Sequence, residues 1–337
     1  ATPVDPRVSS EDPAPAAPPC AVCGSGPVAA DGYCEECGRT QPGDRDHVER
    51  SLDGVAAVSD VGLRHHRNED AFAISATALP DGSPAVIAVV CDGVSSSTRP
   101  HEASAAAAET AAQSLLAALP RGATGQQAMH EALMSAGHAV NALADRDKVP
   151  GRNAPACTVV SAVTTGAELT VGWIGDSRAY WLPMEGTAHP IRLTEDDSWA
   201  AQMVKAGLMS EEEAMADRRA HAITAWLGAD NPELEPHTAS FKPDRAGVVI
   251  VCTDGLWNYA DGAEEMAAKV TAEARTAPLP SAQRLVRFAL DSGGHDNVTV
   301  AVIPFPTPGG RPLRAAPEST GRAPLPPTAT QHVPRAE

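Results

Sequence analysis

The chain is poor in basic residues, poor in aromatic residues and free of long apolar runs. Its 26 lysines and arginines face 43 aspartates and glutamates, which gives a formal net charge of −17. A protein that binds nucleic acid needs a basic surface for the phosphate backbone, and aromatic residues make up only 4% of this chain. The composition therefore argues against nucleic acid as a partner.

No apolar stretch approaches the roughly 20 residues that cross a bilayer, and the first residues lack the charged and apolar regions of a signal peptide. Three of the cysteines, Cys91, Cys157 and Cys252, lie singly in apolar contexts. Such cysteines behave as small buried hydrophobic residues, and free thiols favour a reducing compartment. We therefore expect a cytoplasmic protein without a membrane span.

Composition shifts divide the chain into five segments. Both ends are rich in proline and carry no apolar periodicity, which is typical of disorder, whereas the middle alternates apolar runs with turn residues. We predict a disordered arm over 1–19, a zinc-ribbon-like module of four cysteines over 20–39, a linker over 40–50, a main domain over 51–305 and a disordered Pro-rich tail over 306–337.

Within the main domain, strands follow one another without strict alternation with helices, which favours an antiparallel α+β fold. Strands are chosen for β-branched residues between turns, and helices for apolar residues spaced by three and four. Predicted strands are Val55–Ser59, Ala71–Ala76, Ala85–Cys91, Cys157–Thr164, Leu169–Ile174, Ala179–Leu182, Val248–Cys252 and Val298–Ile303. Predicted helices are Glu102–Leu119, Gln126–Asp145, Ser198–Ala206, Ser210–Ala216 and Ser281–Leu290.

Four further cysteines form two closely spaced pairs, each of which is followed directly by glycine. The pairs are Cys20 with Cys23 and Cys34 with Cys37. Two such knuckles supply four thiolates, which is the ligand set of a closed structural Zn²⁺ site. We predict one structural zinc ion here, and a pair of disulfides is the alternative.

Four aspartates stand in contexts that are unusual for a protein surface. Asp92 and Asp254 each end an apolar run that is typical of a buried strand and are each followed by glycine, and the other two are Asp70, after Asn68-Glu69, and Asp296, after Gly294-His295. Carboxylates at such positions are costly to bury unless a hard cation compensates their charge. Two Mg²⁺ or Mn²⁺ ions that share a carboxylate can activate water for attack on phosphorus. Turn and helix caps are the alternative roles for these aspartates.

The aspartates belong to six motifs whose order and separation resemble those of the metal-dependent protein phosphatases of the PPM, or type 2C, family. The resemblance extends from about Ser51 to Ile303 and is strongest to bacterial members. The motifs are Ser59-Asp60-Val61-Gly62 with Asn68-Glu69-Asp70, Cys91-Asp92-Gly93, Ile174-Gly175-Asp176-Ser177-Arg178-Ala179-Tyr180, Leu193-Thr194 with Asp196-Asp197-Ser198, Cys252-Thr253-Asp254-Gly255-Leu256-Trp257 and Gly293-Gly294-His295-Asp296-Asn297-Val298-Thr299.

The resemblance implies two antiparallel sheets packed as a sandwich between helices, and a site for two Mn²⁺ or Mg²⁺ ions. It assigns Asp92 to both metals, the carbonyl of Gly93 to the second, and Asp254 and Asp296 to the first. Glu69 and Asp70 would hold metal-bound waters. Asp176 matches the position that helps to bind a third ion in bacterial relatives.

The chain departs from the family pattern at two places. An arginine that binds the substrate phosphate usually stands five residues before the first aspartate, but position 65 is a histidine here. Arg64 is the first choice for this role and Arg67 the second. The loop after Gly93 holds Val94 and a run of serines where further glycines, and in eukaryotic members often a histidine, are expected.

The resemblance implies a protein serine/threonine phosphatase that hydrolyses phosphoserine and phosphothreonine with a metal-activated water and no covalent phosphoenzyme. We expect a monomer, with a cognate Ser/Thr kinase as a candidate partner that the zinc module would help to reach. One alternative is a phosphoprotein-binding scaffold of the same fold, which the displaced arginine and the serine-rich loop suggest. A nucleic-acid binder built on the four-cysteine module is the other alternative, and the acidic composition disfavours it.

Overall fold

The protein is described by a computed structural model that covers residues 26–29, 34–36, 43, 45–144, 153–166, 168–184, 188–231 and 233–306. The chain divides into two compact units, of which one comprises Ala1–Gly43 and Arg322–Glu337 and the other Asp44–Gly321. All the helices and strands of the described ranges belong to the second unit.

Five strands form an antiparallel sheet in the order β11-β7-β6-β4-β3. The inner strand β4 is buried on both faces, because alternate side chains point to helices on one side and to a second sheet on the other. Ile87 and Val89 belong to the first set, and Ala88 and Val90 belong to the second. The bounds are β3 Ala71–Ala78, β4 Pro84–Cys91, β6 Val159–Thr164, β7 Leu169–Ile174 and β11 His237–Phe241.

Six strands form the second antiparallel sheet in the order β1-β2-β13-β12-β8-β9. Its central strands β12 and β13 are wholly buried, and Val251 of β12 lies opposite Ala301 of β13. The bounds are β1 His47–Leu52, β2 Val55–Asp60, β8 Arg178–Pro183, β9 Ile191–Arg192, β12 Gly247–Cys252 and β13 Val298–Phe305. A separate short pair joins β5 Ala156–Cys157 to β10 Leu227–Gly228.

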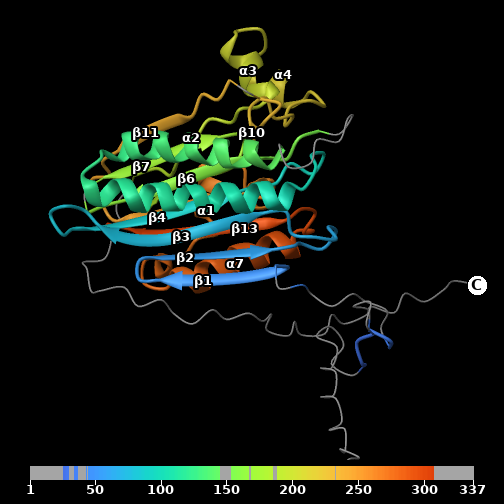
Figure 1. The fold of residues 1–337 in the computed structure, drawn as a ribbon, viewed down its shortest axis with the longest axis horizontal. Helices are drawn as coiled ribbons and strands as arrows, with labels where there is room; N and C mark the ends of the chain where they lie inside the picture. Colours follow the sequence, from blue (N-terminus) through green and yellow to red (C-terminus); the bar gives the residue numbers. More distant parts are fainter. Residues whose placement is uncertain are drawn as a thin grey trace, which may run out of the picture. The chain divides into compact units, whose positions relative to one another are not determined.

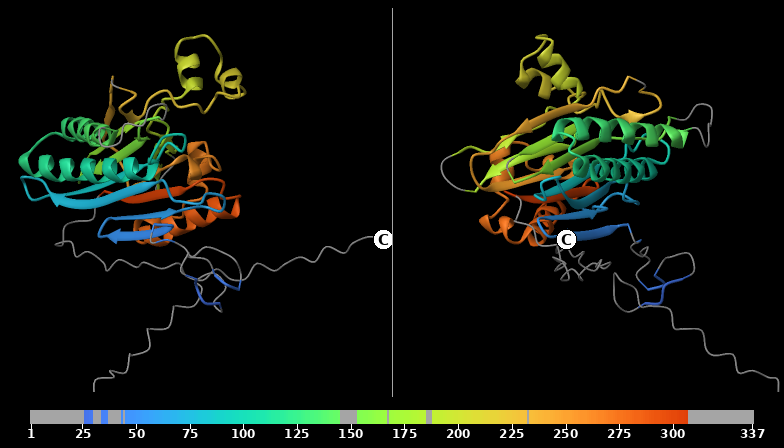
Figure 2. Two further views of the ribbon diagram at one scale, coloured as in Figure 1. Left: turned by 45° about the vertical axis from the view of Figure 1, so that its right-hand side comes forward. Right: turned by 60° about the vertical axis from the view of Figure 1, so that its left-hand side comes forward.

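Helices cover the outer faces of both sheets. Figures 1 and 2 show α1 and α2 side by side over the five-stranded sheet and α7 beneath the six-stranded sheet. The helices are α1 Pro100–Ala118, α2 Gly125–Ala144, α3 Trp199–Lys205, α4 Glu211–Met215, α5 Asp254–Trp257, α6 Ala263–Ala267 and α7 Pro278–Asp291, with 3-10 turns η1 Leu119–Arg121 and η2 Ala272–Arg275.

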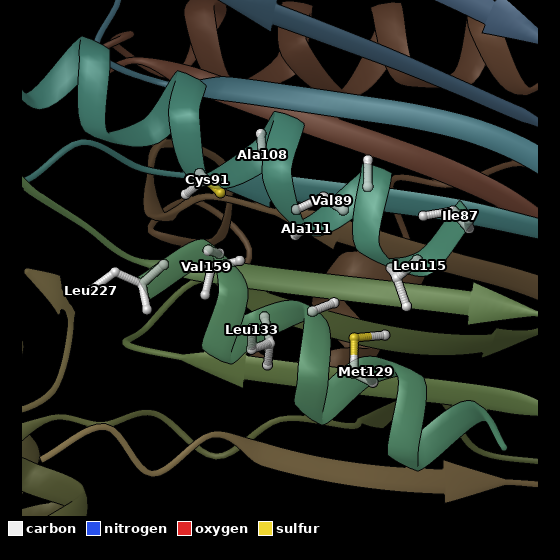
Figure 3. Close-up of a cluster of buried hydrophobic side chains, with 14 of the residues drawn as sticks. Ile87, Val89, Cys91, Ala108, Ala111, Leu115, Met129, Leu133, Val159 and Leu227 are labelled. Carbon is white, nitrogen blue, oxygen red and sulfur yellow. The ribbon is translucent and has the colours of Figure 1, made fainter. Parts of the chain in front are cut away.

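Small side chains allow the two long helices to lie close to the sheet. The inward face of α1 is largely alanine, including Ala108 and Ala111, and α2 contributes the larger Met129 and Leu133 (Figure 3). Alanine has the highest helix propensity, and its small volume leaves room for the branched side chains of the strands. The cores are therefore stacked in layers, with one between the sheets and one under each helical layer.

The structure confirms the predicted fold of two antiparallel sheets flanked by helices. Each predicted strand and helix has a counterpart, and β7 has the same bounds as the prediction. The prediction over Cys157–Thr164 is wrong in one respect, because Thr158 separates β5 from β6. The predictions omitted β1, β9, β10 and β11, and they also omitted α5 and α6.

Strand β1 corrects the predicted boundary between linker and main domain. It begins at His47, inside the segment 40–50 that the sequence assigns to a linker, and it pairs along its whole length with β2. The sequence His-Val-Glu-Arg-Ser-Leu lacks a continuous apolar signal because β1 is an edge strand and none of its residues is fully buried. The prediction missed the strand for this reason.

A small helical excursion, α3 with α4, leaves the main fold between β9 and β10. The Ser210 side chain accepts a hydrogen bond from Glu213 N, and the Glu213 carboxylate accepts one from Ser210 N. Gly207 follows α3 with φ of 66°, a conformation that glycine adopts without strain. A capping box therefore starts α4, and a glycine ends the turn that follows α3.

In the first unit, the structure describes a short turn around Cys34. Val28 forms an antiparallel bridge with Cys34, and Glu35 N donates to Pro27 O at 3.1 Å. The segment 1–19 that was predicted to be a disordered arm, Cys20, Cys23, Cys37 and the predicted tail from 307 onward lie outside the described residues. Among the residues that are described, no helix is long and apolar enough to cross a membrane.

The packing of α2 against the sheet predicts the cost of a cavity. Leu133 is fully buried between α2 and the strands, so Leu133→Ala should lower the free energy of unfolding by about 2–5 kcal/mol. The exposed Glu131 on the same helix provides the control, and Glu131→Ala should change it by less than about 0.5 kcal/mol. Denaturant unfolding measures both changes, and equal changes would contradict the assigned packing.

Candidate active site

Five aspartates from different parts of the sequence lie at strand ends. Asp92 directly follows β4 and Asp254 lies two residues beyond β12, while Asp70 directly precedes β3. Asp176 lies in the turn between β7 and β8, and Asp296 precedes β13. The two sheets bring these ends to the same side of the sandwich, because Thr253 and Thr299, at ends of the second sheet, both contact Asp70 of the first.

The aspartates are close enough to shift one another's pKa. Burial raises the pKa of Asp92 well above its usual value, and the charges of Asp70, Asp254, Asp176 and Asp296 raise it further. Burial also raises the pKa of Asp176 to about 8, with the charge of Asp254 as the next cause. Like charges that cannot separate favour the protonated form, so this site holds negative charge poorly without a compensating cation.

Asp70 is held in place by two hydroxyl donors. Thr299 Oγ1 donates to Asp70 Oδ2 at 2.7 Å, and Thr253 Oγ1 donates to the same oxygen at 3.0 Å. Asp70 Oδ1 is buried and has no hydrogen-bond partner among the described residues. Burial raises the pKa of Asp70 to about 8 against the opposing effect of the threonine hydrogen bonds. One carboxylate oxygen is thus fixed while the other remains available to a ligand.

Asp254 has the same combination of burial and one unpartnered oxygen. Burial and the charge of Asp296 raise its pKa to about 6, and a hydrogen bond with the Asp92 side chain opposes this rise. Its Oδ1 is buried without a partner among the described residues, while Asn258 Nδ2 donates to Oδ2 at 3.3 Å. Two carboxyl groups that share a hydrogen bond are close enough to be bridged by one cation.

Asn297 fixes the loop that leads to Asp70. Its Oδ1 accepts a hydrogen bond from Glu69 N at 2.7 Å, and its Nδ2 donates to Val61 O at 2.9 Å and to Arg67 O at 3.2 Å. One buried side chain therefore ties the segment before β3 to the segment before β13. The sequence motif included Asn297, but the resemblance gave it no role.

Glycine is required where the site loops touch. A Cβ on Gly93 would lie 2.6 Å from Glu69 O and 2.8 Å from Pro100 O, so three segments meet at this residue. A Cβ on Gly255 would clash with the carbonyl oxygen of Asn297. These contacts explain why glycine follows the aspartate in both Asp-Gly motifs.

The structure places Glu69 beside the basic and serine-rich loops. Arg67 Nη2 lies 2.6 Å from Glu69 Oε1, and Ser95 Oγ donates to Glu69 Oε2 at 2.7 Å. Both carboxylate oxygens thus have protein partners. A water molecule held by Glu69, as predicted, would have to bind an oxygen that already contacts Arg67 or Ser95. Ser95 gives the unusual serine-rich loop a contact that sequence reasoning missed.

A buried arginine supports the turn that carries Asp176. Arg178 ion-pairs with Asp196 at 2.7 Å and its guanidinium lies 3.6 Å from the ring centre of Trp257. Trp257 Nε1 in turn donates to the carbonyl oxygen of Asp176 at 2.9 Å. The motifs contained all four residues, but only their spatial arrangement shows that Arg178 and Trp257 together hold Asp176.

The same turn is held on its other side by Asp197. Gly175 N donates to Asp197 Oδ2 at 2.9 Å, and His237 Nε2 lies 2.8 Å from Asp197 Oδ1. The His237 ring also stacks on Trp173 with centroids 5.0 Å apart. His237 belongs to β11, a strand that the sequence did not predict, so this support was missed.

The two candidate arginines for phosphate binding, and the histidine between them, have different surroundings. Arg67 is engaged by Glu69, whereas Arg64 is exposed and makes no hydrogen bond or ion pair with another described residue. His65, the residue at the position where the family has arginine, lies with Nε2 3.2 Å from Asp296 Oδ1. The structure thus brings His65 to the acidic group, while Arg64 next to it remains available.

The donors present suit a divalent cation. Buried carboxylates with unpartnered oxygens form an all-oxygen ligand set, which Mg²⁺ and Mn²⁺ prefer. Within the described ranges, no group of three or more His, Cys, Asp and Glu side chains is arranged to hold an ion as it stands. The carboxylates would therefore have to turn toward an ion, and the hydrogen bond between Asp92 and Asp254 would have to break.

Comparison with known proteins assigns the chain to a family. A family model described as Protein phosphatase 2C matches residues 64–288. The protein phosphatase PhpP of Streptococcus pneumoniae is 33% identical over 133 residues, which are 39% of this chain and 50% of PhpP. The serine/threonine protein phosphatase PstP of Mycobacterium tuberculosis is 31% identical over 255 residues, which are 73% of this chain and 44% of PstP. The chain thus spans about half the length of these curated relatives.

Solved structures of PstP show a similar fold. The M. tuberculosis phosphatase PstP/Ppp matches with a TM-score of 0.56 and 27% identity, over 75% of this chain and 98% of that chain. The catalytic domain of PstP in complex with two manganese ions matches with a TM-score of 0.52 and 26% identity, over 76% and 97% of the two chains.

The support of Asp197 by His237 predicts a pH-dependent stability. The hydrogen bond to Asp197 raises the pKa of His237, although partial burial lowers it. The protonated histidine thus stabilises the fold fully below the unfolded-state pKa of about 6.5, and this contribution disappears as pH rises through the raised pKa. His237→Gln should therefore lower the melting temperature at about pH 5.5, and less at about pH 8.5.

The control is His189→Gln, because His189 pairs with Glu264 in a largely exposed position. It should leave the melting temperature unchanged at both pH values. A His237→Gln loss that is equal at both pH values would show that stacking on Trp173, and not protonation, accounts for the effect.

Proposed function

Because the chain belongs to the protein phosphatase 2C family, we propose that it hydrolyses phosphoserine and phosphothreonine in proteins. The observation that carries the proposal is the group of buried and half-buried, mutually repelling aspartates at the strand ends, two of which, Asp70 and Asp254, have a buried oxygen without a partner among the described residues. A site of this kind needs divalent cations to hold its charge. The relative PstP carries the name of a serine/threonine protein phosphatase, and PhpP that of a protein phosphatase.

The proposed ligands are the residues that the motifs single out. Asp92 would bridge two Mn²⁺ or Mg²⁺ ions, Asp254 and Asp296 would complete the first, and the carbonyl of Gly93 would bind the second. Asp70 and Glu69 would hold waters around the ions, and Asp176 would help to hold a third. Bound ions would supply an activated water and would stabilise the charge that develops on the phosphate.

The protein's own groups prepare the site for this chemistry. Thr253 and Thr299 fix one oxygen of Asp70, so its other oxygen has a defined direction. Cation binding would favour the ionised forms of Asp92 and Asp254, because burial and uncompensated neighbouring charge raise their pKa values. The buried loops around Gly93 and Gly255 limit the movement that these carboxylates can make.

Arg64 is the residue that we propose for binding the substrate phosphate. It is exposed beside the acidic group, and no described residue neutralises it by an ion pair. Arg67 could serve only if its ion pair with Glu69 opened. A guanidinium in this place would orient the phosphate with paired hydrogen bonds.

The four-cysteine module extends the proposal beyond the phosphatase unit. We propose that Cys20, Cys23, Cys34 and Cys37 hold one structural Zn²⁺, and the turn that places Cys34 in a bridge with Val28 is consistent with a zinc knuckle. The module would position a monomeric, cytoplasmic enzyme near phosphoproteins or a cognate Ser/Thr kinase.

Elemental analysis should find one zinc ion per chain, and Cys34→Ser should abolish zinc binding. The absence of zinc from the intact chain would contradict the proposal.

Removal of one proposed ligand tests the function. Asp254→Asn should reduce Mn²⁺-dependent hydrolysis of a phosphothreonine peptide by about 100-fold or more, which corresponds to about 2.7 kcal/mol of transition-state stabilisation. It should also reduce the rise in melting temperature that Mn²⁺ causes in the native protein. Asp53→Asn is the matched control, because Asp53 is an exposed aspartate in the β1–β2 turn.

The native protein must turn over substrate in this test. If it binds the phosphopeptide but hydrolyses none with Mn²⁺ or Mg²⁺, it is a phosphoprotein-binding scaffold and the enzyme proposal is wrong. Full activity in Asp254→Asn would show that the first metal does not depend on this residue.

The two arginines can be separated by kinetics. Arg64→Ala should raise the KM for a phosphopeptide about tenfold, a change of about 1.4 kcal/mol, because it removes a charge-assisted contact with the phosphate. Arg67→Ala should have a smaller effect, since Arg67 is already paired with Glu69. Mn²⁺ affinity should remain the same in Arg64→Ala, and the opposite ranking of the two KM values would reassign the role to Arg67.

A further inference from the structure

Strand β3 forms the open edge of the five-stranded sheet. Among the described residues, its backbone pairs with β4 on one side and with no strand on the other. In Figure 1, β3 runs between α1 and β2. All of its residues except Ala78 are half-buried, although those of neighbouring β4 are nearly all buried. The free edge therefore presents a row of backbone donors and acceptors.

The sequence of β3 differs from that of the other edge strands in the two sheets. Those strands carry charged residues or histidine, such as Glu49 and Arg50 in β1, Arg192 in β9 and His237 in β11. β3 reads Ala-Phe-Ala-Ile-Ser-Ala-Thr-Ala, without charge or proline, and is the longest of the four. Exposed edges normally carry such groups to prevent pairing with another chain. The sequence of β3 is therefore typical of a strand whose second edge also pairs with another strand.

A groove of about 630 Å³ runs beside this edge. Phe72 and Ile74 of β3 line it, α1 forms one wall with Ala105 and Leu116, and β1 forms the other with Val48 and Arg50. Small side chains on α1 leave space next to the strand. Because the edge lies between a helix and a strand, a slender extended chain can reach it more easily than a second folded domain can.

The groove is continuous with the candidate active site. Asn68 and Asp70 line its inner end, and β3 begins at Ala71, directly after Asp70. A chain paired along the eight residues of β3 would extend about 26 Å at 3.3 Å per residue and would end beside the acidic group. The occupant that this continuity favours is a segment of the protein whose phosphorylated residue is being hydrolysed.

Arg45 and Arg50 are the basic residues that line the groove, and Glu49, Asp70 and Glu109 are the acidic ones. At the inner end, the exposed Arg45 donates to a neutral acceptor, the carbonyl oxygen of His101 at 3.2 Å, and can therefore meet an acidic side chain. Glu49 on the same wall is compensated, since it lies 2.9 Å from His47 Nε2 and accepts a hydrogen bond from Gln283. An acidic side chain near the phosphorylated residue would thus meet Arg45.

We propose that this groove, between α1, β1 and the edge of β3, binds an extended acidic segment of the phosphoprotein substrate as an added strand. The proposal rests on the proposed phosphatase function and specifies how a protein substrate is selected. Backbone hydrogen bonds to β3 supply affinity, while small or apolar side chains fill the space against α1.

The test compares two substrates on the intact protein. One is a phosphothreonine peptide with a flank of alternating valine and glutamate that is long enough to pair along β3. It is made in two versions, with the flank N-terminal or C-terminal to the phosphothreonine. The other stops beside the phosphothreonine. The long peptide should have a KM about tenfold lower than the short one, which is about 1.4 kcal/mol of added binding.

Two variants block the groove from α1. Ala105→Phe and, separately, Gln113→Trp place a large ring in the groove, at half-buried and exposed positions that line it. Each should abolish the advantage of the long peptide and leave p-nitrophenyl phosphate hydrolysis unchanged. Ala117→Phe, at an exposed position of α1 that does not line the groove, is the matched control. N-methylation of every second flank residue removes the backbone donors on one side of the flank. Of the two possible sets of alternate residues, methylation of one set should also remove the advantage of the long peptide.

The outcomes separate the groove from the active site. If the native protein hydrolyses neither peptide, the proposed function fails. If it hydrolyses both peptides equally, or if both groove variants retain the advantage, the groove proposal fails and the phosphatase stands. If the native protein sediments as a dimer and Gln113→Trp makes it a monomer, the occupant is a second copy of the chain and the proposal is overturned.

Discussion

Repulsion between buried carboxylates is the constraint on which the rest of this structure depends. Burial and mutual charge raise the pKa of Asp70, Asp92, Asp176 and Asp254 together, so each destabilises the charged form of the others. A fold that keeps such groups together must fix them by other contacts. The threonines below Asp70 and the stacked Arg178 and Trp257 beside Asp176 provide these contacts.

The two sheets act as one support because the contacts cross between them. The hydroxyls of Thr253 and Thr299 belong to ends of the six-stranded sheet, but they fix an aspartate at the start of β3. Asn297 likewise joins the segments before β3 and β13. The relative position of the two sheets therefore determines the geometry of the carboxylates, and the packed core between the sheets maintains that position.

Sequence reasoning succeeded where burial on both faces leaves an apolar run. The bounds of β7 and the ends of β4 and β12 followed from such runs, and the ordered motifs identified the acidic residues. It failed at the edge strands β1, β9 and β11, which are not fully buried and are partly polar. Contacts such as His237 with Asp197, and Ser95 with Glu69, join residues distant in sequence that carry no shared pattern.

Among the four edge strands of the two sheets, β3 is the one that the sequence predicted. β3 was predicted because its sequence resembles that of an interior strand, yet it lies at an edge. Its apolar pattern on one face is explained by Phe72 and Ile74, which pack against the core between the sheets. The lack of charge along its free edge has no such explanation within the fold. Uncharged edges are prone to pair with another chain, so the mismatch at β3 supports the proposed pairing with a neighbour that the described residues do not themselves supply.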